Sequence, residues 1–300
     1  MSTENPSRYD AIVVGGSYAG LSAALQLARA RRRLLVIDAG IRRNRFAQAS
    51  HGFLGQDGRP PELIAAEGRQ QLLAYPNVQW QDGSAASARR EEGGFSVSME
   101  DGAGFQASYL VLATGVKDGL PAVEGLAERW GRSVFHCPYC HGYELNEGRI
   151  GVLAVGPNSM HHALMLPHWG RVTFFINGSF EPDAEQRAAL QARGVRIETR
   201  RVRRLADTAT VELEDDERVV LDGLFTATHM TMASPLAQQL GCELDESPMG
   251  HYIRTDALKQ TTVPSVFACG DAARMAGNVA LAVGDGAQAG ASAHRAMLFG

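Results

Sequence analysis

Residues 9–20 read YDAIVVGGSYAG, an apolar stretch that runs into a glycine-rich turn. The apolar residues before the turn predict a short buried strand, and the pattern over Leu21–Ala28 predicts a helix directly after it. Gly15 and Gly20 match the first and third glycines of the dinucleotide-binding fingerprint, and Ser17 takes the place of the middle one. A serine is small enough to let a pyrophosphate approach the backbone. The stretch therefore predicts a strand–turn–helix unit that binds a nucleotide.

An acidic residue follows where such a unit requires one. The next apolar run, Leu34–Ile37, predicts a strand that ends at Asp38, roughly 20 residues after the turn, where an acidic side chain binds a ribose hydroxyl. The alternative is an ordinary βαβ turn with an incidental cluster of glycines. The place of the motif at the first strand, together with its acid, favours nucleotide binding.

A second βαβ unit is predicted near the middle of the chain, with strands over 150–155 and 172–176 and a helix over 160–166. Its fingerprint positions hold Ala154, Gly156 and Ser159, so only the central glycine remains, and Pro157 removes a backbone donor. The strand leads into residues 177–179, Asn-Gly-Ser, with neither an acid for a ribose nor arginines for a 2′-phosphate. This unit is a poor match for a nicotinamide site.

A pair of close cysteines lies between the two units. Cys137 and Cys140 are separated by a proline and a tyrosine and flanked by His136 and His141. Two thiols at this spacing can close a small disulfide ring, and a neighbouring imidazole can move the protons that thiol–disulfide exchange requires. In a reducing compartment such a pair is catalytic or binds a metal. A zinc site would use these thiols and a histidine, but no second close pair completes the usual four ligands.

Other cysteines and histidines have plainer interpretations. Cys242 and Cys269 lie alone in the sequence, as buried small residues do. His161 and His162 are adjacent on a predicted helix and point to different faces, which favours surface or packing roles over a shared metal. His51 lies in the irregular segment 41–61, and the sequence leaves open whether it is a solvated loop residue or a functional one.

Composition excludes several classes of function. The chain has 300 residues, 45% of them hydrophobic, which is enough for two well-filled domains. Its net charge of −4 offers no field for nucleic acid or an acidic membrane surface. No apolar run approaches the roughly 18 residues that span a bilayer, and residues 1–8 lack the apolar middle of a secretory signal. We therefore expect a cytoplasmic protein that binds neither nucleic acid nor membrane.

The remaining predicted elements lead to a second candidate cofactor segment. A strand over 262–268 is expected to run into Gly270 and Asp271, whose carboxylate could hold a sugar-like chain or simply cap a helix. A long helix over 279–297 follows, and a crossing between domains is expected around 117–121. The other expected elements are helices over 62–73 and 182–193 and strands over 78–80, 95–99, 105–112, 195–198, 210–213 and 219–225.

Taken in order, these features resemble the low-molecular-weight thioredoxin reductase family, within the FAD-dependent pyridine nucleotide-disulfide oxidoreductases. The resemblance rests on the first turn, Asp38, the Ala-Thr-Gly at 113–115, the cysteine pair and the closing Val-Phe-Ala-Cys-Gly-Asp at 266–271, and it covers essentially the whole chain. It implies an α/β fold with two Rossmann-like domains of the three-layer ββα type, the second inserted into the first. An FAD domain over 1–117 and 246–300, an inserted domain over 118–245 and a homodimer are expected.

The resemblance also implies roles for individual residues. Cys140 would face the flavin, Cys137 would exchange with a dithiol substrate, and His141, where the family usually has an acid, would carry protons, with His136 beside it. Asp38 would bind the adenosine ribose of FAD, and Gly270 and Asp271 its ribityl and phosphate region. The FAD-binding candidates are Gly15, Gly16, Ser17, Ala19, Gly20, Asp38, Ala113, Thr114, Gly115, Gly270 and Asp271.

Within that family, a Cys-Pro-aromatic-Cys-His-Gly motif with a degraded nicotinamide turn resembles the dithiol oxidases that close disulfides in natural products such as gliotoxin and holomycin. This implies oxidation of a small-molecule dithiol or a protein thiol through the cysteine pair and FAD, with O2 as acceptor and hydrogen peroxide as product. The alternative is an NAD(P)H-dependent thioredoxin or small-disulfide reductase. The sequence does not identify the substrate.

Overall fold

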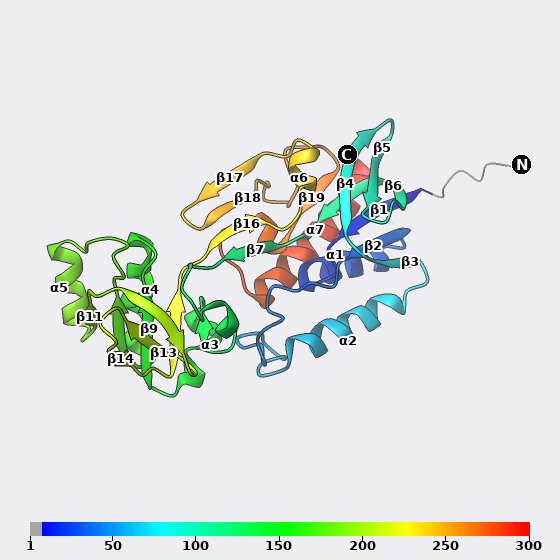
Figure 1. Ribbon diagram of the computed structural model, residues 1–300. Coiled ribbons are helices and arrows are strands. Elements are labelled where there is room, and N and C mark those ends of the chain that lie inside the picture. The colour runs from blue at the N-terminus through cyan, green and yellow to red at the C-terminus, as the bar shows by residue number, and fades with distance from the viewer. Residues whose placement is uncertain (1–7) are drawn as a thin grey trace, which may run out of the picture. The chain divides into compact units, whose positions relative to one another are not determined.

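The computed structural model describes residues 8–300, which form two compact units (Figure 1). Unit 1 comprises the described residues up to Arg45 together with Pro61–Lys117 and Met230–Gly300, so both ends of the chain contribute to it. Unit 2 comprises Phe46–Pro60 and Asp118–His229. Over the described range, no helix combines the length and the apolar character needed to cross a membrane.

Unit 1 is built on a mainly parallel sheet with the order β3-β2-β1-β6-β5-β4, in which β19 also pairs with β6. Strand β6 is long enough to pair with β1 along one edge and with two partners along the other, antiparallel with β5 near its start and parallel with β19 near its end. The elements of this sheet and its helices are β1 (Tyr9–Val14), α1 (Tyr18–Arg29), β2 (Leu34–Asp38), α2 (Pro61–Leu73), β3 (Val78–Asp82), β4 (Ala85–Glu91), β5 (Gly94–Met99), β6 (Gly104–Leu112), α6 (Leu236–Gln239), β19 (Val266–Ala268), the 3-10 helix η5 (Gly270–Ala273) and α7 (Val279–Phe299).

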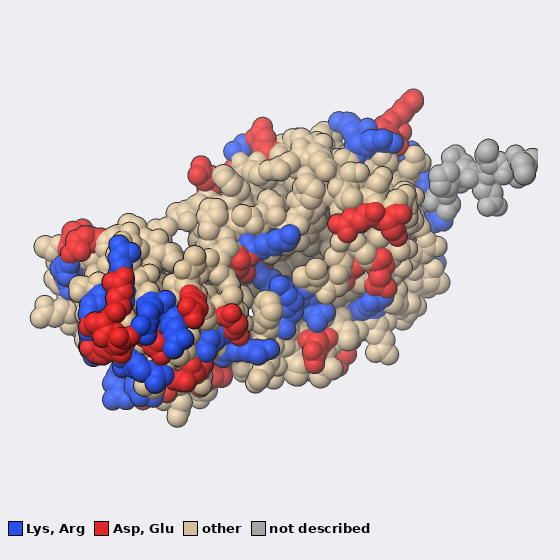
Figure 2. Space-filling view, viewed as in Figure 1, with Lys and Arg blue, Asp and Glu red and all other residues tan. Residues whose placement is uncertain are grey.

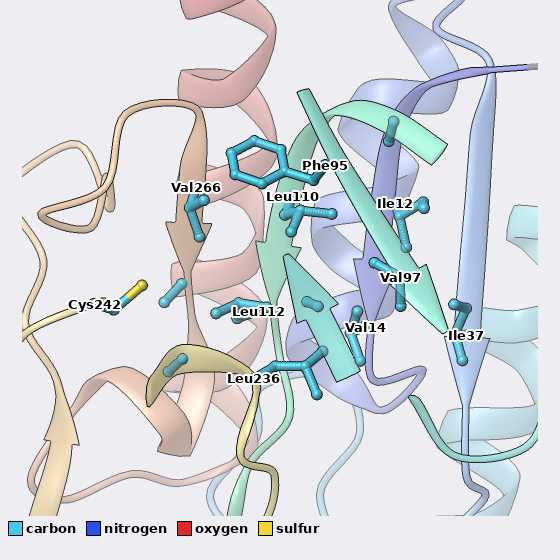
Figure 3. Packing of buried hydrophobic residues seen from close by; sticks show 14 of the residues in the cluster. Ile12, Val14, Ile37, Phe95, Val97, Leu110, Leu112, Leu236, Cys242 and Val266 are labelled. Carbon is cyan, nitrogen blue, oxygen red and sulfur yellow. The ribbon is translucent and has the colours of Figure 1, made fainter. Parts of the chain in front are cut away.

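The core of unit 1 follows the two-residue period of its strands. In β1, Ile12 and Val14 point into a cluster that includes Leu110 and Leu112 of β6 and Val97 of β5 (Figure 3). The alternate side chains of β1 are also fully buried, on the opposite face. On the helical side, α1 packs along α7, where a Cβ atom at Gly286 or Gly290 would overlap the backbone of α1. Strands buried on both faces hold the turn after β1 in place.

Unit 2 repeats this plan with a parallel sheet in the order β11-β10-β9-β15-β8. One face packs against α4 and α5, and the other against the antiparallel sheet β12-β13-β14. Its elements are η1 (Ala127–Arg129), β8 (Val134–Phe135), α3 (Pro138–His141), η2 (Tyr143–Leu145), β9 (Arg149–Leu153), η3 (Pro157–Ser159), α4 (Met160–Met165), η4 (Leu166–His168), β10 (Arg171–Phe175), α5 (Ala184–Ala192), β11 (Arg196–Glu198), β12 (Val202–Ala206), β13 (Thr210–Leu213), β14 (Arg218–Val219) and β15 (Gly223–Thr226).

The chain passes between the units in β7 (Val116–Gly119) and β16 (His229–Met232). These two strands are neighbours in a four-stranded sheet with β17 (Leu244–Ser247) and β18 (Gly250–Ile253). The α/β class with two Rossmann-type units, predicted from the sequence, is confirmed. The two units differ from the expected domain boundaries in two stretches, since 230–245 belongs to unit 1 and 46–60 to unit 2. The first difference follows from α6, whose Gln239 side chain accepts a hydrogen bond from the backbone N–H of Ala88 in β4.

Two predicted strands are wrong in extent. The single strand expected over 219–225 is two strands in different sheets, because Asp222 turns the chain by accepting a hydrogen bond from the backbone N–H of Arg149 at 2.7 Å. The strand expected over 262–268 is confined to β19. Pro264 has no N–H to donate, and Ser265 has a left-handed φ of 68°, so neither fits a ladder. Strand β4 was not predicted, because its polar sequence has little apolar alternation.

Candidate functional site

The turn after β1 is closed so tightly that its glycines cannot carry side chains. A Cβ atom at Gly15 would overlap the carbonyl of Ala113, and one at Gly20 would overlap the carbonyl of Gly15. Gly15 also has a φ of 103°, which side chains rarely adopt. Ser17 precedes α1 but makes no side-chain capping bond, and the first turn of α1 holds no acidic residue. The leading N–H groups of a twelve-residue helix are therefore directed at the turn, as phosphate binding requires.

Asp38 closes the turn from the end of β2. Its Oδ1 accepts a hydrogen bond from the backbone N–H of Gly16 at 2.9 Å, and Trp80 of β3 covers the same glycine. The guanidinium of Arg69 in turn lies 4.2 Å from the Trp80 ring centroid. Trp80 and Arg69 were not predicted as part of the site. Their only sequence signal would have been the parallel pairing of β3 with β2, which sets Trp80 beside Val36.

Segments from the middle and the end of unit 1 meet this turn. Residues 113–115 follow β6, and the backbone N–H of Ala113 donates to the carbonyl of Val14 at 2.8 Å. Gly270, with a φ of 68°, lies so close to α1 that a Cβ atom there would be 2.7 Å from the Cβ of Ala19. Ala113 and Gly270 therefore lie at the same turn as Gly15 and Ala19.

Asp271 is ion-paired. Its Oδ2 lies 2.9 Å from Nη1 of Arg43, and both side chains are largely buried, with exposures of 21% and 18%. Asp271 does not cap a helix, since Cys269 occupies the capping position of η5 and Asn278 caps α7. Arg43 was not predicted as a site residue. Around the turn, the glycine cradle, the uncapped helix and Asp38 fit the pyrophosphate and ribose of a dinucleotide such as FAD.

The redox motif is ordered as a short helix in unit 2. Cys137 and Cys140 form a disulfide, with their Cα atoms 5.3 Å apart, and Cys137 lies at the N-cap of α3. Both cysteines are partly exposed. Position 142 requires a glycine, because a Cβ atom there would lie 2.8 Å from the Trp169 ring. The same tryptophan ring makes an edge contact with Tyr139. The cysteine pair is thus held by aromatic packing while it remains reachable.

Three imidazoles, of which only His162 is fully buried, lie around the pair. His162 of α4 is 8% exposed, and its Nε2–H donates to the carbonyl of His136 at 2.7 Å. The His136 ring stacks on Trp130 at 5.8 Å, and the His141 ring stacks on Phe135 at 4.2 Å. His162 was interpreted as a surface or packing residue, and the packing role is the one observed. It also fixes the backbone one residue before Cys137.

His141 is a neutral imidazole at physiological pH. Burial, and in second place the positive charge of His51, lower its pKa from 6.5 to about 4. A neutral ring nitrogen next to Cys140 can accept a proton from a thiol. His51 belongs to the loop 46–60 of unit 2, and the sequence had left its role open.

The other two cysteines are not accessible for exchange. Cys242 and Cys269 are buried free thiols. Burial raises the pKa of Cys269 to about 12 and raises that of Cys242, so both stay protonated. Within residues 8–300, no group of three or more His, Cys, Asp and Glu side chains has an arrangement that could hold a metal ion.

The second turn, at Gly156, is built differently from the first. It is closed by the Ser159 hydroxyl, which accepts from the backbone N–H of Val155 at 3.0 Å. It leads through the 3-10 segment η3 into α4, which has only six residues before Pro167 interrupts it. A helix this short has little of the N-terminal dipole that binds a phosphate.

Most arginines that follow β11 or lie on β12 and β14 are paired with carboxylates. Arg200 pairs with Glu198, Asp215 and Glu217, and Glu212 pairs with three further arginines. Figure 2 shows the two signs interleaved over the region of β13 and β14. Arg201 differs, because its exposed guanidinium lies over Gly178, where a Cβ atom would be 3.0 Å from it. The sequence analysis looked for arginines only after β10 and so missed this one, which follows β11.

Comparisons with known proteins agree with this description. The model of the pyridine nucleotide-disulphide oxidoreductase family matches residues 9–296. An oxidoreductase from Agrobacterium tumefaciens is 56% identical in sequence, with a TM-score of 0.96 over 98% of this chain and 99% of that one. The structure of HlmI is 34% identical, with a TM-score of 0.91 over 99% and 94%. Thioredoxin reductase tcpT of Claviceps purpurea is 34% identical over 99% of this chain and 96% of its own length.

Proposed function

This chain belongs to the pyridine nucleotide-disulphide oxidoreductase family and is an oxidoreductase similar to thioredoxin reductases; on that premise we propose that it oxidises a dithiol to a disulfide through Cys137 and Cys140. FAD is the proposed cofactor and O2 the proposed final acceptor. The observation that carries the proposal is the partly exposed disulfide at the start of α3, followed directly by His141, whose ring stacks on Phe135.

The protein residues act on the thiols of the substrate. His141 accepts the proton of a substrate thiol, and the thiolate attacks Sγ of Cys137, which breaks its bond to Cys140. The second substrate thiol loses its proton to solvent and attacks the substrate sulfur of the mixed disulfide. The bond to Cys137 breaks, Cys137 leaves as a thiolate and takes the proton held by His141, and the oxidised product is released. His162 holds the backbone at His136, so the attacked sulfur is presented from a fixed position.

The cofactor residues of unit 1 hold the electron acceptor. The Gly15–Gly20 turn and α1 would bind the FAD pyrophosphate, with Ser17 and Ala19 beside it, and Asp38 would bind a ribose. Residues 113–115, Gly270 and Asp271 would line the rest of the cofactor, with Arg43 fixing the Asp271 carboxylate. When bound, FAD supplies a two-electron acceptor that O2 can reoxidise, with release of hydrogen peroxide.

Oxygen uptake tests the proposal. Purified protein is mixed with dithiothreitol and with a panel of small cyclisable dithiols, and O2 consumption and peroxide are recorded. The native protein should turn over, Cys140→Ser should not, and Cys242→Ala, which removes a buried thiol outside the pair, should keep most of the activity. If dithiols reduce the native protein but no O2 is consumed, the proposed oxidase activity is contradicted.

One observation favours a second candidate, an NAD(P)H-dependent disulfide reductase. Arg201, which follows β11 and whose guanidinium lies beside Gly178, offers a cation for a 2′-phosphate that the turn sequence alone did not reveal. Anaerobic mixing separates the two functions. Rapid bleaching of the flavin band by NADPH would support the reductase, whereas bleaching by dithiothreitol and not by NADPH supports the oxidase.

A further inference from the structure

Arg43 lies on the segment that follows β2, and its guanidinium contacts two distant parts of unit 1. Nη1 is 2.9 Å from Oδ2 of Asp271, and Nη2 donates to Sδ of Met230 in β16 at 3.6 Å. The Arg43 side chain is 18% exposed, and Met230 is fully buried. The guanidinium is therefore a fixed group inside the unit, whereas an arginine on a solvated surface gains little from its ion pairs.

The segment that carries Arg43 is anchored at the start of α1. Nδ2 of Asn44 donates to the hydroxyl of Tyr18 at 3.1 Å, and that hydroxyl donates to the carbonyl of Pro61 at 3.0 Å. Tyr18 is the first residue of α1 and is buried. The position of Arg43 is thus tied to the helix that follows the Gly15–Gly20 turn.

The second oxygen of Asp271 is also confined. Oδ1 lies against the backbone at Gly277, where a Cβ atom would overlap it. One oxygen faces Arg43 and the other faces residue 277, so the carboxylate has one orientation. A largely buried carboxylate needs a cation or hydrogen-bond donors beside it, and removal of the cation leaves an unpaired charge.

The strand order indicates which part of a dinucleotide meets Asp271. Asp38 ends β2 and Asp271 follows β19, with β1 and β6 between these strands in the sheet and the Gly15–Gly20 turn directly after β1. Three strand spacings of about 4.8 Å place the ends of β2 and β19 roughly 14 Å apart. FAD has hydroxyl groups on both sides of its pyrophosphate, on a ribose and on a ribityl chain. A carboxylate only accepts hydrogen bonds, so Asp38 suits the ribose and Asp271 the ribityl hydroxyls.

We propose that Arg43 is a positioning residue of the cofactor site, which holds the Asp271 carboxylate in the one orientation that accepts hydrogen bonds from the ribityl hydroxyls of FAD. The proposal rests on the cofactor of the function proposed above. Arg43 acts through Asp271, so its effect on FAD affinity disappears when position 271 has no carboxylate.

The FAD affinity of the full-length holoprotein tests this role without substrate or O2. Serial dilution releases FAD, whose fluorescence rises when it leaves the protein, and the released fraction gives a dissociation constant. Displacement of FAD by excess ADP gives the affinity of the other part of the site, because ADP has the ribose and pyrophosphate but no ribityl chain. Circular dichroism shows whether each variant is folded.

Arg43→Gln should weaken FAD binding by about ten- to hundredfold, because the Asp271 carboxylate loses its charged partner, and should change ADP affinity by less than about threefold. Asp271→Asn should weaken FAD binding to a similar degree. The double variant should bind no more weakly than the weaker single variant, since both changes remove the same interaction. Arg43→Lys, which restores a cation, should recover most of the native affinity.

Arg254→Ala is the matched control. This arginine of unit 1 also pairs with two carboxylates, those of Glu243 and Asp245, but at an exposed site beside β18. Its variant should bind FAD as the native protein does. Loss of FAD there would contradict a specific role for Arg43.

A double variant that loses the product of the two single effects would show that Arg43 and Asp271 act independently, and would overturn the proposal. It would also be overturned by an Arg43→Gln protein that loses ADP affinity as much as FAD affinity or does not fold with FAD present, or by an Arg43→Lys protein as weak as Arg43→Gln. The proposed oxidase fails separately, if the native protein binds FAD but does not couple dithiol oxidation to O2. That outcome leaves the FAD affinities interpretable.

Discussion

The two βαβ turns of this chain share a plan but not a chemistry. In unit 1, three glycines let β1, α1 and residues 113–115 approach one another, and α1 continues for twelve residues. In unit 2, a serine hydroxyl and a proline close the turn, and α4 ends after six residues. The helix after the second turn instead supplies His162, which holds the backbone before Cys137. The comparison indicates that one turn is suited to a phosphate while the helix after the other has become a support for the disulfide.

The largest expected effect is at the first turn. Gly20→Ala should abolish flavin binding, with at least a hundredfold loss of affinity, because the new methyl group would overlap the carbonyl of Gly15 and force the turn open. The measurement is the ratio of flavin to protein absorbance after purification. Gly284→Ala, at an exposed helical position with open space, should keep the flavin. Asn158→Ala in the second turn should also keep the flavin. Loss of flavin in that variant would contradict the proposal that the first turn, and not the second, binds the cofactor.

Acid should destabilise unit 2 through His141. In the unfolded chain a histidine binds its proton near pH 6.5, while the folded chain resists protonation down to a pKa of about 4. The free energy of unfolding should therefore fall as pH drops from about 6.5 to about 4, by up to about 3 kcal/mol. Hydrogen exchange of β9 and β10 peptides at several pH values measures this. In His141→Asn the slope should be shallower, and an unchanged slope would assign the acid sensitivity to other groups.

A smaller effect is expected from the helix after the second turn. His162→Gln should cost about 1–3 kcal/mol of stability and slow reduction of the disulfide, because the carbonyl of His136 loses a buried donor. Urea unfolding measures the loss of stability. Alkylation of the cysteines that dithiothreitol sets free, followed by mass spectrometry, measures the rate at which the disulfide is reduced. His161→Gln, the exposed neighbour, should stay within about 0.5 kcal/mol of the native protein. Equal stability and equal rates of disulfide reduction in the two variants would contradict a role for α4 in supporting the disulfide.

The smallest expected effect is at Arg201. If the second turn does not bind a nicotinamide nucleotide, Arg201→Ala should leave dithiol oxidation unchanged and NADPH consumption at background. A rise in KM for NADPH without a matching rise for NADH would instead show that Arg201 binds a 2′-phosphate. That result would make the two turns more alike in function than their geometry suggests.

The sequence predicted elements best where periodicity and glycine chemistry coincide. The β1 turn, Asp38 and the cysteine pair could be found because each needs particular residue types at fixed spacing. Arg43, Trp80 and Arg201 could not, because their roles arise from packing between segments distant in sequence. The single strand expected over 219–225 was wrong because the bond from Arg149 to Asp222 is long-range. The roles of the cofactor residues, the use of O2 and a homodimer stay predictions.

The loop 46–60 has a consequence for how this protein is made. The loop leaves the ribosome well before η2, whose Glu144 it contacts. At a synthesis rate of roughly 5–20 residues per second, several seconds pass before η2 is made. During this interval the loop has no folded unit 2 to pack against. The loop is thus a segment whose native contacts form late, and unit 2 expressed as one contiguous fragment would lack it.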